Sequence, residues 1–173
     1  MNQTPPKPNV ILVNCDDLGY GDIGCYGSKH HATPALDRMA AEGVRFTDFY
    51  MAAPVCSPSR AAMMTGCYPL RVGLETGCEI IVLRPGEPIG LSGDETTVAS
   101  ILKDAGYATE IIGKWHCGDQ PEFLPTRHGF DSWYGIPYSN DMGITKSHSH
   151  FPPLPLVRDE EVIQEQPDQA ALT

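Results

Sequence analysis

A run of five residues near the start of the chain, Asn-Val-Ile-Leu-Val at positions 9–13, constrains the fold most strongly. An uninterrupted apolar and β-branched run of this length is typical of a strand that is buried on both faces of a parallel or mixed sheet. The run leads into a polar, glycine-punctuated loop that contains Asp16 and Asp17. Because ligands of open α/β sheets bind at the carboxyl ends of strands, we expect these adjacent carboxylates to lie at a binding site.

The segments that follow alternate between signals for helix and strand. Thr33-Pro34 opens a predicted helix that ends before Gly43, and residues 44–50 alternate as a strand should. A second helix is predicted at about 96–105, followed by a strand over 107–112. With 173 residues the chain is long enough for one domain with its own core. The sequence therefore predicts a single α/β domain.

A third predicted helix follows Cys56. Ser57 is a good N-cap, Pro58 suits the first helical position, and Gly66 ends the helix. This places Cys56 just outside a helix N-terminus, where free backbone N–H groups favour an anion. Arg60, about one turn later, adds a guanidinium suited to oxyanions. A buried structural cysteine before an ordinary helix is the alternative interpretation.

Two further polar residues, Lys114 and His116, follow the strand at 107–112 and flank a tryptophan. Lysine is a point charge for an anion, and histidine is the usual proton donor or acceptor near neutral pH. Taken singly, a surface lysine, a partly buried histidine and a solvated Asp-Asp turn are ordinary features. Together, these residues fall at the ends of predicted strands and helices and predict a functional site.

Charge and cysteine spacing exclude several classes of protein. A formal net charge of −10 without a basic stripe argues against nucleic-acid binding. The six cysteines have irregular spacing, with no zinc-binding pattern. The first eight residues lack the apolar core of a signal peptide, and no run is long enough to cross a membrane. As written, we expect a cytoplasmic protein without membrane partners, or a periplasmic or secreted one if a leader is missing.

Five motifs together resemble the type I, formylglycine-dependent sulfatases of the arylsulfatase A kind. They are Asn9-Val-Ile-Leu-Val-Asn-Cys-Asp-Asp-Leu-Gly-Tyr-Gly-Asp, Cys56-Ser-Pro-Ser-Arg-Ala-Ala with Thr-Gly-Cys-Tyr-Pro, Gly113-Lys-Trp-His-Cys-Gly, Leu124-Pro-Thr-Arg-His-Gly-Phe-Asp and Gly135-Ile-Pro-Tyr-Ser-Asn-Asp. The resemblance covers about residues 9–143. It implies an alkaline-phosphatase-like fold, with a mixed, mostly parallel sheet flanked by helices.

The resemblance also implies the chemistry of Cys56. A separate formylglycine-generating enzyme would oxidise this residue to Cα-formylglycine, whose hydrated aldehyde is the nucleophile. One hydroxyl of the diol attacks sulfur and releases the alcohol. The second hydroxyl then loses a proton, and the re-forming aldehyde expels sulfate. The implied substrate is a small-molecule or glycan sulfate ester.

The resemblance assigns the metal ligands and the residues around the nucleophile. Asp16, Asp17 and the modified Cys56 would bind a divalent cation, calcium first and magnesium as the alternative; hard carboxylate oxygens suit both.

Four other residues take roles by the same resemblance. Arg60 would steady the nucleophile, and Lys114 would bridge it to the sulfate. His116 would assist proton transfers of the diol, and Ser139 falls on the substrate side. These positive groups would stabilise charge on the sulfuryl oxygens.

The family is far longer than this chain, and its later segment has no counterpart here. That segment carries a substrate-contacting histidine, an Asp-Asn pair that completes the metal site, and another lysine. We therefore expect residues 1–8 to be a flexible arm, 9–143 the N-terminal part of a catalytic domain, and 144–173 a loop or tail at a truncation point, with His148 and His150 on a solvated loop. Cys67 stands where the family usually has arginine.

Three alternatives stay open. A phosphonate or phosphate monoester hydrolase of the same superfamily uses the same Cys-x-Pro-x-Arg nucleophile. A non-catalytic, truncated remnant would keep the motifs without activity. A thiol enzyme would pair Cys56 with His116.

Overall fold

The computed structural model describes residues 7–76, 79–145 and 150–171, so that Cys78 and His148 lie outside the described residues. The chain divides into two compact units, Met1–Phe49 (unit 1) and Tyr50–Thr173 (unit 2). The single domain expected from the sequence stays a prediction. No helix within the described residues has both the length and the apolarity needed to cross a bilayer.

Unit 1 is built around one helix and two short 3-10 turns. The helix α1 (Pro34–Glu42) begins at the predicted proline, and the N–H of Gly43 closes its end on the Met39 carbonyl at 2.9 Å. The turns η1 (Tyr20–Asp22) and η2 (Gly24–Tyr26) precede it. Asp37 of α1 accepts a hydrogen bond from the Cys25 N–H at 2.6 Å. Polar contacts of this kind hold α1 against η2.

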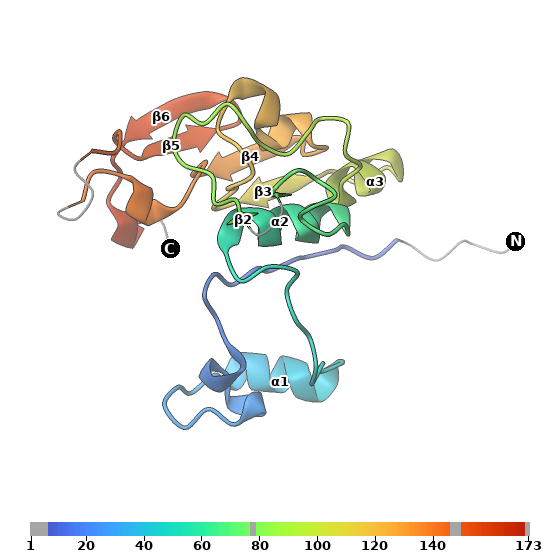
Figure 1. Ribbon diagram of the computed structural model, residues 1–173. Helices are drawn as coiled ribbons and strands as arrows, with labels where there is room; N and C mark the ends of the chain where they lie inside the picture. The colour runs from blue at the N-terminus through green and yellow to red at the C-terminus, as the bar shows by residue number, and fades with distance from the viewer. Residues whose placement is uncertain (1–6, 77–78, 146–149, 172–173) are drawn as a thin grey trace, which may run out of the picture. The chain divides into compact units, whose positions relative to one another are not determined.

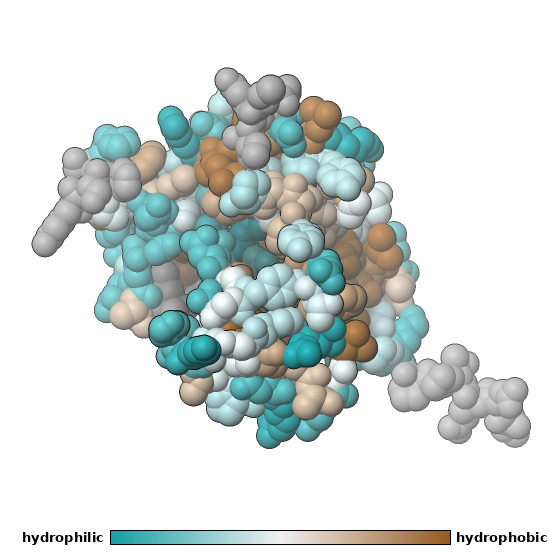
Figure 2. Space-filling model, turned by 60° about the horizontal axis from the view of Figure 1, so that its bottom comes forward, coloured by the Kyte–Doolittle hydropathy of each residue, from teal (hydrophilic) through white to brown (hydrophobic). Residues whose placement is uncertain are grey.

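The two strands predicted in unit 1 are wrong. Residues 9–13 and 44–50 have no strand structure, and the apolar run from Val10 to Val13 is exposed. A strand needs a hydrogen-bonded neighbour to satisfy its backbone, and among the described residues all strand pairings lie within unit 2. On the face drawn in Figure 2, brown apolar side chains are open to solvent beside teal polar ones.

Unit 2 contains a four-stranded sheet with the order β3-β4-β5-β6 (Figure 1). Its strands are β3 (Glu110–Ile112), β4 (Ser132–Gly135), β5 (Pro155–Arg158) and β6 (Glu161–Glu165). β3 and β4 pair in parallel, whereas β4/β5 and β5/β6 pair antiparallel. A two-stranded ribbon, β1 (Glu75–Thr76) and β2 (Glu79–Ile80), lies apart from this sheet in the pairing. The predicted mixed α/β class is confirmed.

The segment predicted as a loop or tail, residues 144–173, instead supplies two strands of the sheet. β5 and β6 form a hairpin whose turn contains Asp159 at φ 57°, a left-handed conformation that aspartate tolerates better than most residues. All five residues of β6 are exposed because it is an edge strand with charged ends. The short 3-10 turn η6 (Gln169–Ala171) follows.

Two helices of unit 2 agree closely with the sequence signals. α2 (Cys56–Thr65) ends at Gly66, which takes the left-handed φ of 69° that favours glycine. α3 (Val98–Asp104) lies inside the predicted range 96–105, and the Thr97 hydroxyl caps it by accepting from the Ser100 N–H at 3.1 Å. Three 3-10 turns complete the unit: η3 (Pro121–Phe123), η4 (Pro125–Arg127) and η5 (Asn140–Met142).

The core of unit 2 lies between α2 and the sheet. Ala61 and Met64 of α2 belong to one buried cluster with Trp133 of β4 and Val157 of β5. The cluster also contains buried residues from the loops on either side of β1 and β2 and after β3, namely Val72, Leu74, Leu83, Leu91, Trp115, Cys117 and Leu124. The core thereby holds α2 and the end of β3 in fixed positions.

One glycine sets the separation of the two parallel strands. A Cβ at Gly135 of β4 would lie 1.8 Å from the carbonyl oxygen of Gly113, just after β3. The backbones are joined there by hydrogen bonds from Gly113 N to Tyr134 O at 2.8 Å and from Ile136 N to Gly113 O at 3.3 Å. Only glycine allows this approach.

Candidate active site

Cys56 is the first residue of α2, so the helix begins two residues before the predicted first position, Pro58, and the prediction that Cys56 lies just outside it is wrong. Val55, in an extended conformation with φ −133° and ψ 162°, is the N-cap, and its carbonyl accepts from the Ser59 N–H at 3.3 Å. Pro58 falls in the first turn, where its missing N–H leaves no helical bond unmade. Cys56 is half-buried and is a free thiol at the positive end of the helix.

Ser57 does not cap the helix as predicted but reaches another loop. Its side chain is fully buried, and its hydroxyl oxygen accepts a hydrogen bond from the backbone N–H of Leu83 at 3.0 Å. The hydroxyl thus ties the first turn of α2 to the loop that follows β2.

Arg60 connects α2 to the segment after β3. It lies four residues after Cys56 and therefore on the same face of the helix. Its Nη1 donates to the backbone carbonyl of Lys114 at 2.6 Å. A charge-assisted bond of this length fixes the guanidinium beside the first turn of α2.

Lys114 in turn reaches the segment after β4. Its Nζ donates to the Ser139 hydroxyl at 3.2 Å, across 25 positions of sequence. Three predicted site residues, Arg60, Lys114 and Ser139, are therefore linked in a row. Their roles in catalysis stay predictions.

His116 is fully buried and has an unusual backbone conformation. Its φ of 60° lies in the left-handed region, which costs a non-glycine residue of order 1–3 kcal/mol unless its surroundings hold it there. Its backbone N–H donates to the Pro137 carbonyl at 3.0 Å. Its Nε2 lies 2.9 Å from the Leu83 carbonyl oxygen, which can only accept, so the proton sits on Nε2.

Leu83 is the site residue that sequence reasoning missed. Its N–H is bonded to Ser57 and its carbonyl to His116, so one peptide segment bridges α2 and the histidine. The contacts are made by backbone atoms 26 and 33 positions away from their partners. No local signal in the sequence marks such a residue.

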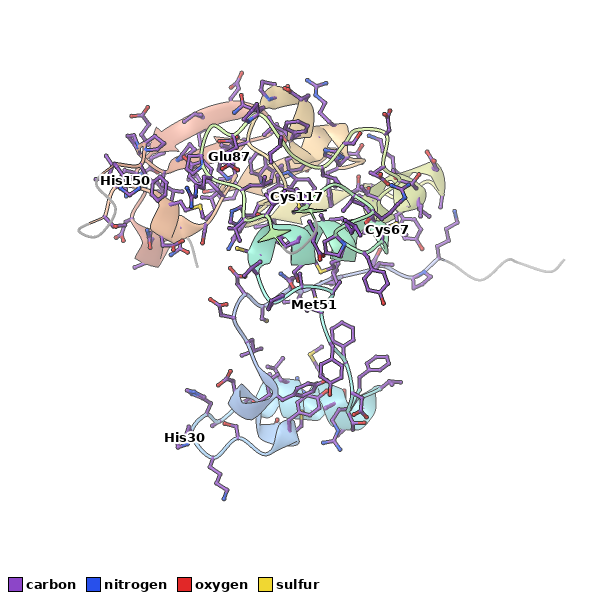
Figure 3. All side chains as sticks on the ribbon, in the orientation of Figure 1. His30, Met51, Cys67, Glu87, Cys117 and His150 are labelled. Atoms are coloured by element: carbon purple, nitrogen blue, oxygen red, sulfur yellow. The ribbon has the colours of Figure 1, made fainter. Side chains whose placement is uncertain are left out.

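A second cysteine, Cys117, lies in the interior next to His116. Figure 3 labels it in the middle of unit 2. Burial raises the pKa of the Cys117 thiol to about 12, although the charge of Arg60 acts in the opposite direction. The thiolate is the reactive form of cysteine. Cys117 is therefore a structural thiol, and the half-buried Cys56 is the more accessible of the two.

The two predicted metal ligands, Asp16 and Asp17, belong to unit 1. Both are exposed, and Asp17 has a left-handed φ of 59°. Across residues 7–76, 79–145 and 150–171, no three His, Cys, Asp or Glu side chains come together to hold a metal ion. Two adjacent carboxylates nevertheless fit the oxygen chemistry that calcium and magnesium require. Their combination with Cys56 stays a prediction.

Comparison with known proteins gives consistent results. The family model described as Sulfatase matches residues 8–171. Arylsulfatase A of Bos taurus is 51% identical over 148 residues, which make up 84% of this chain and 28% of that protein. The chain thus spans less than a third of this curated relative.

Solved structures show the same likeness. The crystal structure of Ps i-CgsB matches with a TM-score of 0.77 and 34% identity, covering 92% of this chain and 38% of that one. BT4656, solved in complex with its substrate D-glucosamine-2-N,6-O-disulfate, matches with a TM-score of 0.61 and 28% identity, over 83% of this chain and 25% of that one. These matches support the alkaline-phosphatase-like fold expected from the sequence.

Proposed function

The chain belongs to the sulfatase family, and we propose that it is the nucleophile-bearing part of an enzyme that hydrolyses a sulfate ester to an alcohol and sulfate. One observation carries the proposal: the row of contacts from Arg60 through Lys114 to Ser139 beside the first turn of α2. Arg60 on α2 and Lys114, held by these contacts, would supply a local anion site in a chain with a net charge of −10.

Cys56 is the proposed nucleophile position. After conversion by a formylglycine-generating enzyme, residue 56 supplies a hydrated aldehyde, one hydroxyl of which displaces the alcohol from sulfur. Membership of the sulfatase family supports this over a thiol enzyme. The bond from the Nε2 of His116 to the Leu83 carbonyl leaves Nδ1 able to accept a proton in either mechanism. A thiol enzyme would need that histidine as the base for Cys56.

The neighbouring side chains have complementary roles. Arg60 holds its guanidinium on the nucleophile's face of α2 and favours the ionised hydroxyl. The Nζ of Lys114 donates a hydrogen bond to the Ser139 hydroxyl, and these two side chains together bind the sulfuryl oxygens of the substrate. Since negative charge spreads over those oxygens during transfer, preorganised cations lower the barrier. His116, held in one tautomer by Leu83, takes part in the proton transfers of the diol.

A divalent cation, calcium first and magnesium as the alternative, is the proposed cofactor. Asp16, Asp17 and the modified Cys56 would hold it, and a divalent cation at such a site acidifies a bound hydroxyl and neutralises the sulfate. The oxygen donors of the two aspartates support this choice. A glycan sulfate ester is the proposed substrate class, supported by the sugar disulfate bound to BT4656; a small aryl sulfate is the alternative.

The decisive experiment uses the complete protein that contains this chain, produced together with a formylglycine-generating enzyme. Peptide mass spectrometry across Cys56 reads its conversion, and sulfate release from an aryl sulfate reads activity. We expect an aldehyde at position 56 and loss of activity in Cys56→Ala, with Cys67→Ala as the matched control that stays active. An unmodified thiol, or release from an aryl phosphonate in place of the sulfate, would contradict the proposal.

A further inference from the structure

Nearly all described arginine and lysine side chains of unit 2 form an ion pair, a hydrogen bond or a ring contact within that unit. Besides Arg60 and Lys114, the engaged residues are Arg71 with Glu95 at 2.5 Å, Lys103 with Asp131 at 2.7 Å, Arg127 with Glu160 at 2.8 Å, and Arg158 over the Tyr134 ring at 5.1 Å. In the described part of unit 2, Arg84 is the one arginine or lysine whose side chain has no such contact. An exposed guanidinium without an internal role is available to a ligand.

Arg84 directly follows the residue that bridges the candidate site. Leu83 is buried and bonded through its backbone to Ser57 and His116, whereas Arg84 is exposed. Adjacent Cα atoms are about 3.8 Å apart. The Cα of Arg84 is thus adjacent to Leu83, whose carbonyl accepts the hydrogen bond from His116.

The turn that carries Arg84 is fastened at both ends. The N–H of Arg84 donates to Glu87 Oε2 at 3.0 Å, and the N–H of Glu87 donates to the Arg84 carbonyl at 3.3 Å. Gly86, at a left-handed φ of 78°, donates its N–H to Asp119 Oδ2 at 2.7 Å. Figure 3 labels Glu87 on this loop of unit 2. Both nearby carboxylates therefore accept from backbone amides, and neither forms an ion pair with Arg84.

We infer that Arg84 recognises a second anionic group of the substrate, a sulfate or carboxylate other than the one that is hydrolysed. The inference rests on the proposed function and specifies its substrate: a sugar with at least two negative charges. The planar fork of a guanidinium matches the oxygens of a sulfate or carboxylate. On a turn held by three hydrogen bonds, the binding costs little ordering of the backbone.

Calorimetry on the complete protein tests the inference without turnover. In a Cys56→Ala background, the dissociation constants of D-glucosamine-2-N,6-O-disulfate and D-glucosamine-6-O-sulfate are measured at low salt. Arg84→Gln removes the charge, and Arg84→Lys keeps it without the fork. Arg71→Gln is the matched control, because Arg71 is another exposed arginine of unit 2 and is already paired with Glu95.

We expect Arg84→Gln to weaken binding of the disulfate about tenfold and Arg84→Lys by less, with the monosulfate and the Arg71→Gln variant unchanged. The difference should shrink in high salt, because an exposed charge is screened. An unchanged disulfate constant, an equal loss for the monosulfate, or no disulfate binding at all would each overturn the inference.

Activity of the protein with Cys56 intact separates the two proposals. If an aryl sulfate is not hydrolysed while the Arg84→Gln difference persists, the proposed function fails and anion recognition by Arg84 stands. If the aryl sulfate is hydrolysed and Arg84→Gln binds the disulfate like the parent, the function stands and the inference about Arg84 fails.

Discussion

Val10, Ile11, Leu12 and Val13 of unit 1 are 56–86% exposed, whereas Leu154, Leu156 and Val157 of unit 2 are at most 5% exposed. Both sets read in sequence as apolar runs. The second set lies on and beside β5, which has hydrogen-bonded neighbours on both sides, and the first set has no strand partner among the described residues. The contrast teaches that an apolar run becomes a buried strand only where another strand is present to satisfy its backbone.

Truncation of a core tryptophan gives the largest expected difference between the units. Trp133 is 1% exposed in β4, and Trp133→Ala should lower the free energy of unfolding by about 3–5 kcal/mol through the cavity it leaves. Met39 of α1 is 65% exposed, and Met39→Ala should change it by less than about 0.5 kcal/mol. Urea unfolding of the complete protein measures both. Similar losses of unfolding free energy in Trp133→Ala and Met39→Ala would contradict the expected difference between the two units.

Acid should affect unit 2 more than unit 1. Burial beside Trp115, whose ring lies 5.5 Å away, lowers the pKa of His128 to about 4. Because the unfolded histidine takes up its proton near pH 6.5, this residue should reduce stability as pH falls from about 6.5 to about 4, by up to about 3 kcal/mol.

Unfolding midpoints at pH 7, 5 and 4 check this sign. His128→Phe should flatten the pH dependence, whereas the control His30→Gln, in the exposed part of unit 1, should leave it unchanged. Figure 3 labels His30 in that unit. A steeper loss of stability in His128→Phe would contradict the assignment.

Unit 1 should contribute to the reaction through its aspartates and not through its stability. In the complete protein, Asp17→Asn should lower kcat/KM for an aryl sulfate by about 100-fold, or about 2.7 kcal/mol, because it weakens one of the proposed oxygen ligands of the cation. Added calcium should restore part of the loss. Asp48→Asn, another exposed carboxylate of unit 1, is the control. Equal activity of the Asp17→Asn and Asp48→Asn variants would show that Asp17 takes no part in the reaction.

The smallest effect concerns the link between α2 and Leu83. Ser57→Ala leaves a buried N–H of Leu83 without its acceptor and should cost about 1–2 kcal/mol of stability. Ser28→Ala removes an exposed hydroxyl of unit 1 that accepts from the His31 N–H at 3.3 Å and should cost less than about 0.5 kcal/mol. Chemical unfolding distinguishes the two. No loss in Ser57→Ala would show that water replaces the hydroxyl.

Most helix boundaries could be predicted because their signals are local, whereas the start of α2 was predicted two residues too late. Pro34, Gly66 and Thr97 each act within one turn of the helix that they begin or end. Strand assignment depends on partners distant in sequence, so residues 9–13 and 44–50 were predicted wrongly. β5 and β6 were missed because charged residues at the hairpin hide the alternation.

The candidate site divides in the same way. Residue types and their places at helix and strand ends led to Arg60, Lys114 and His116, and the resemblance to sulfatases added Ser139. The structure brings Arg60, Lys114 and Ser139 into one row of contacts. Leu83 was missed because its part is played by backbone atoms. Backbone atoms are the same in every residue, and only the fold makes one of them specific.

The close approach at Gly135 also limits how this sequence can change during evolution. Since any side chain there would collide with the Gly113 carbonyl, even alanine requires β3 and β4 to separate first. Lys114 follows β3 and Ser139 follows β4, so the same separation would pull apart the two residues that are proposed to bind the sulfate. A lineage could therefore replace this glycine only by giving up the geometry of the site, whereas most exposed positions of β6 can drift freely.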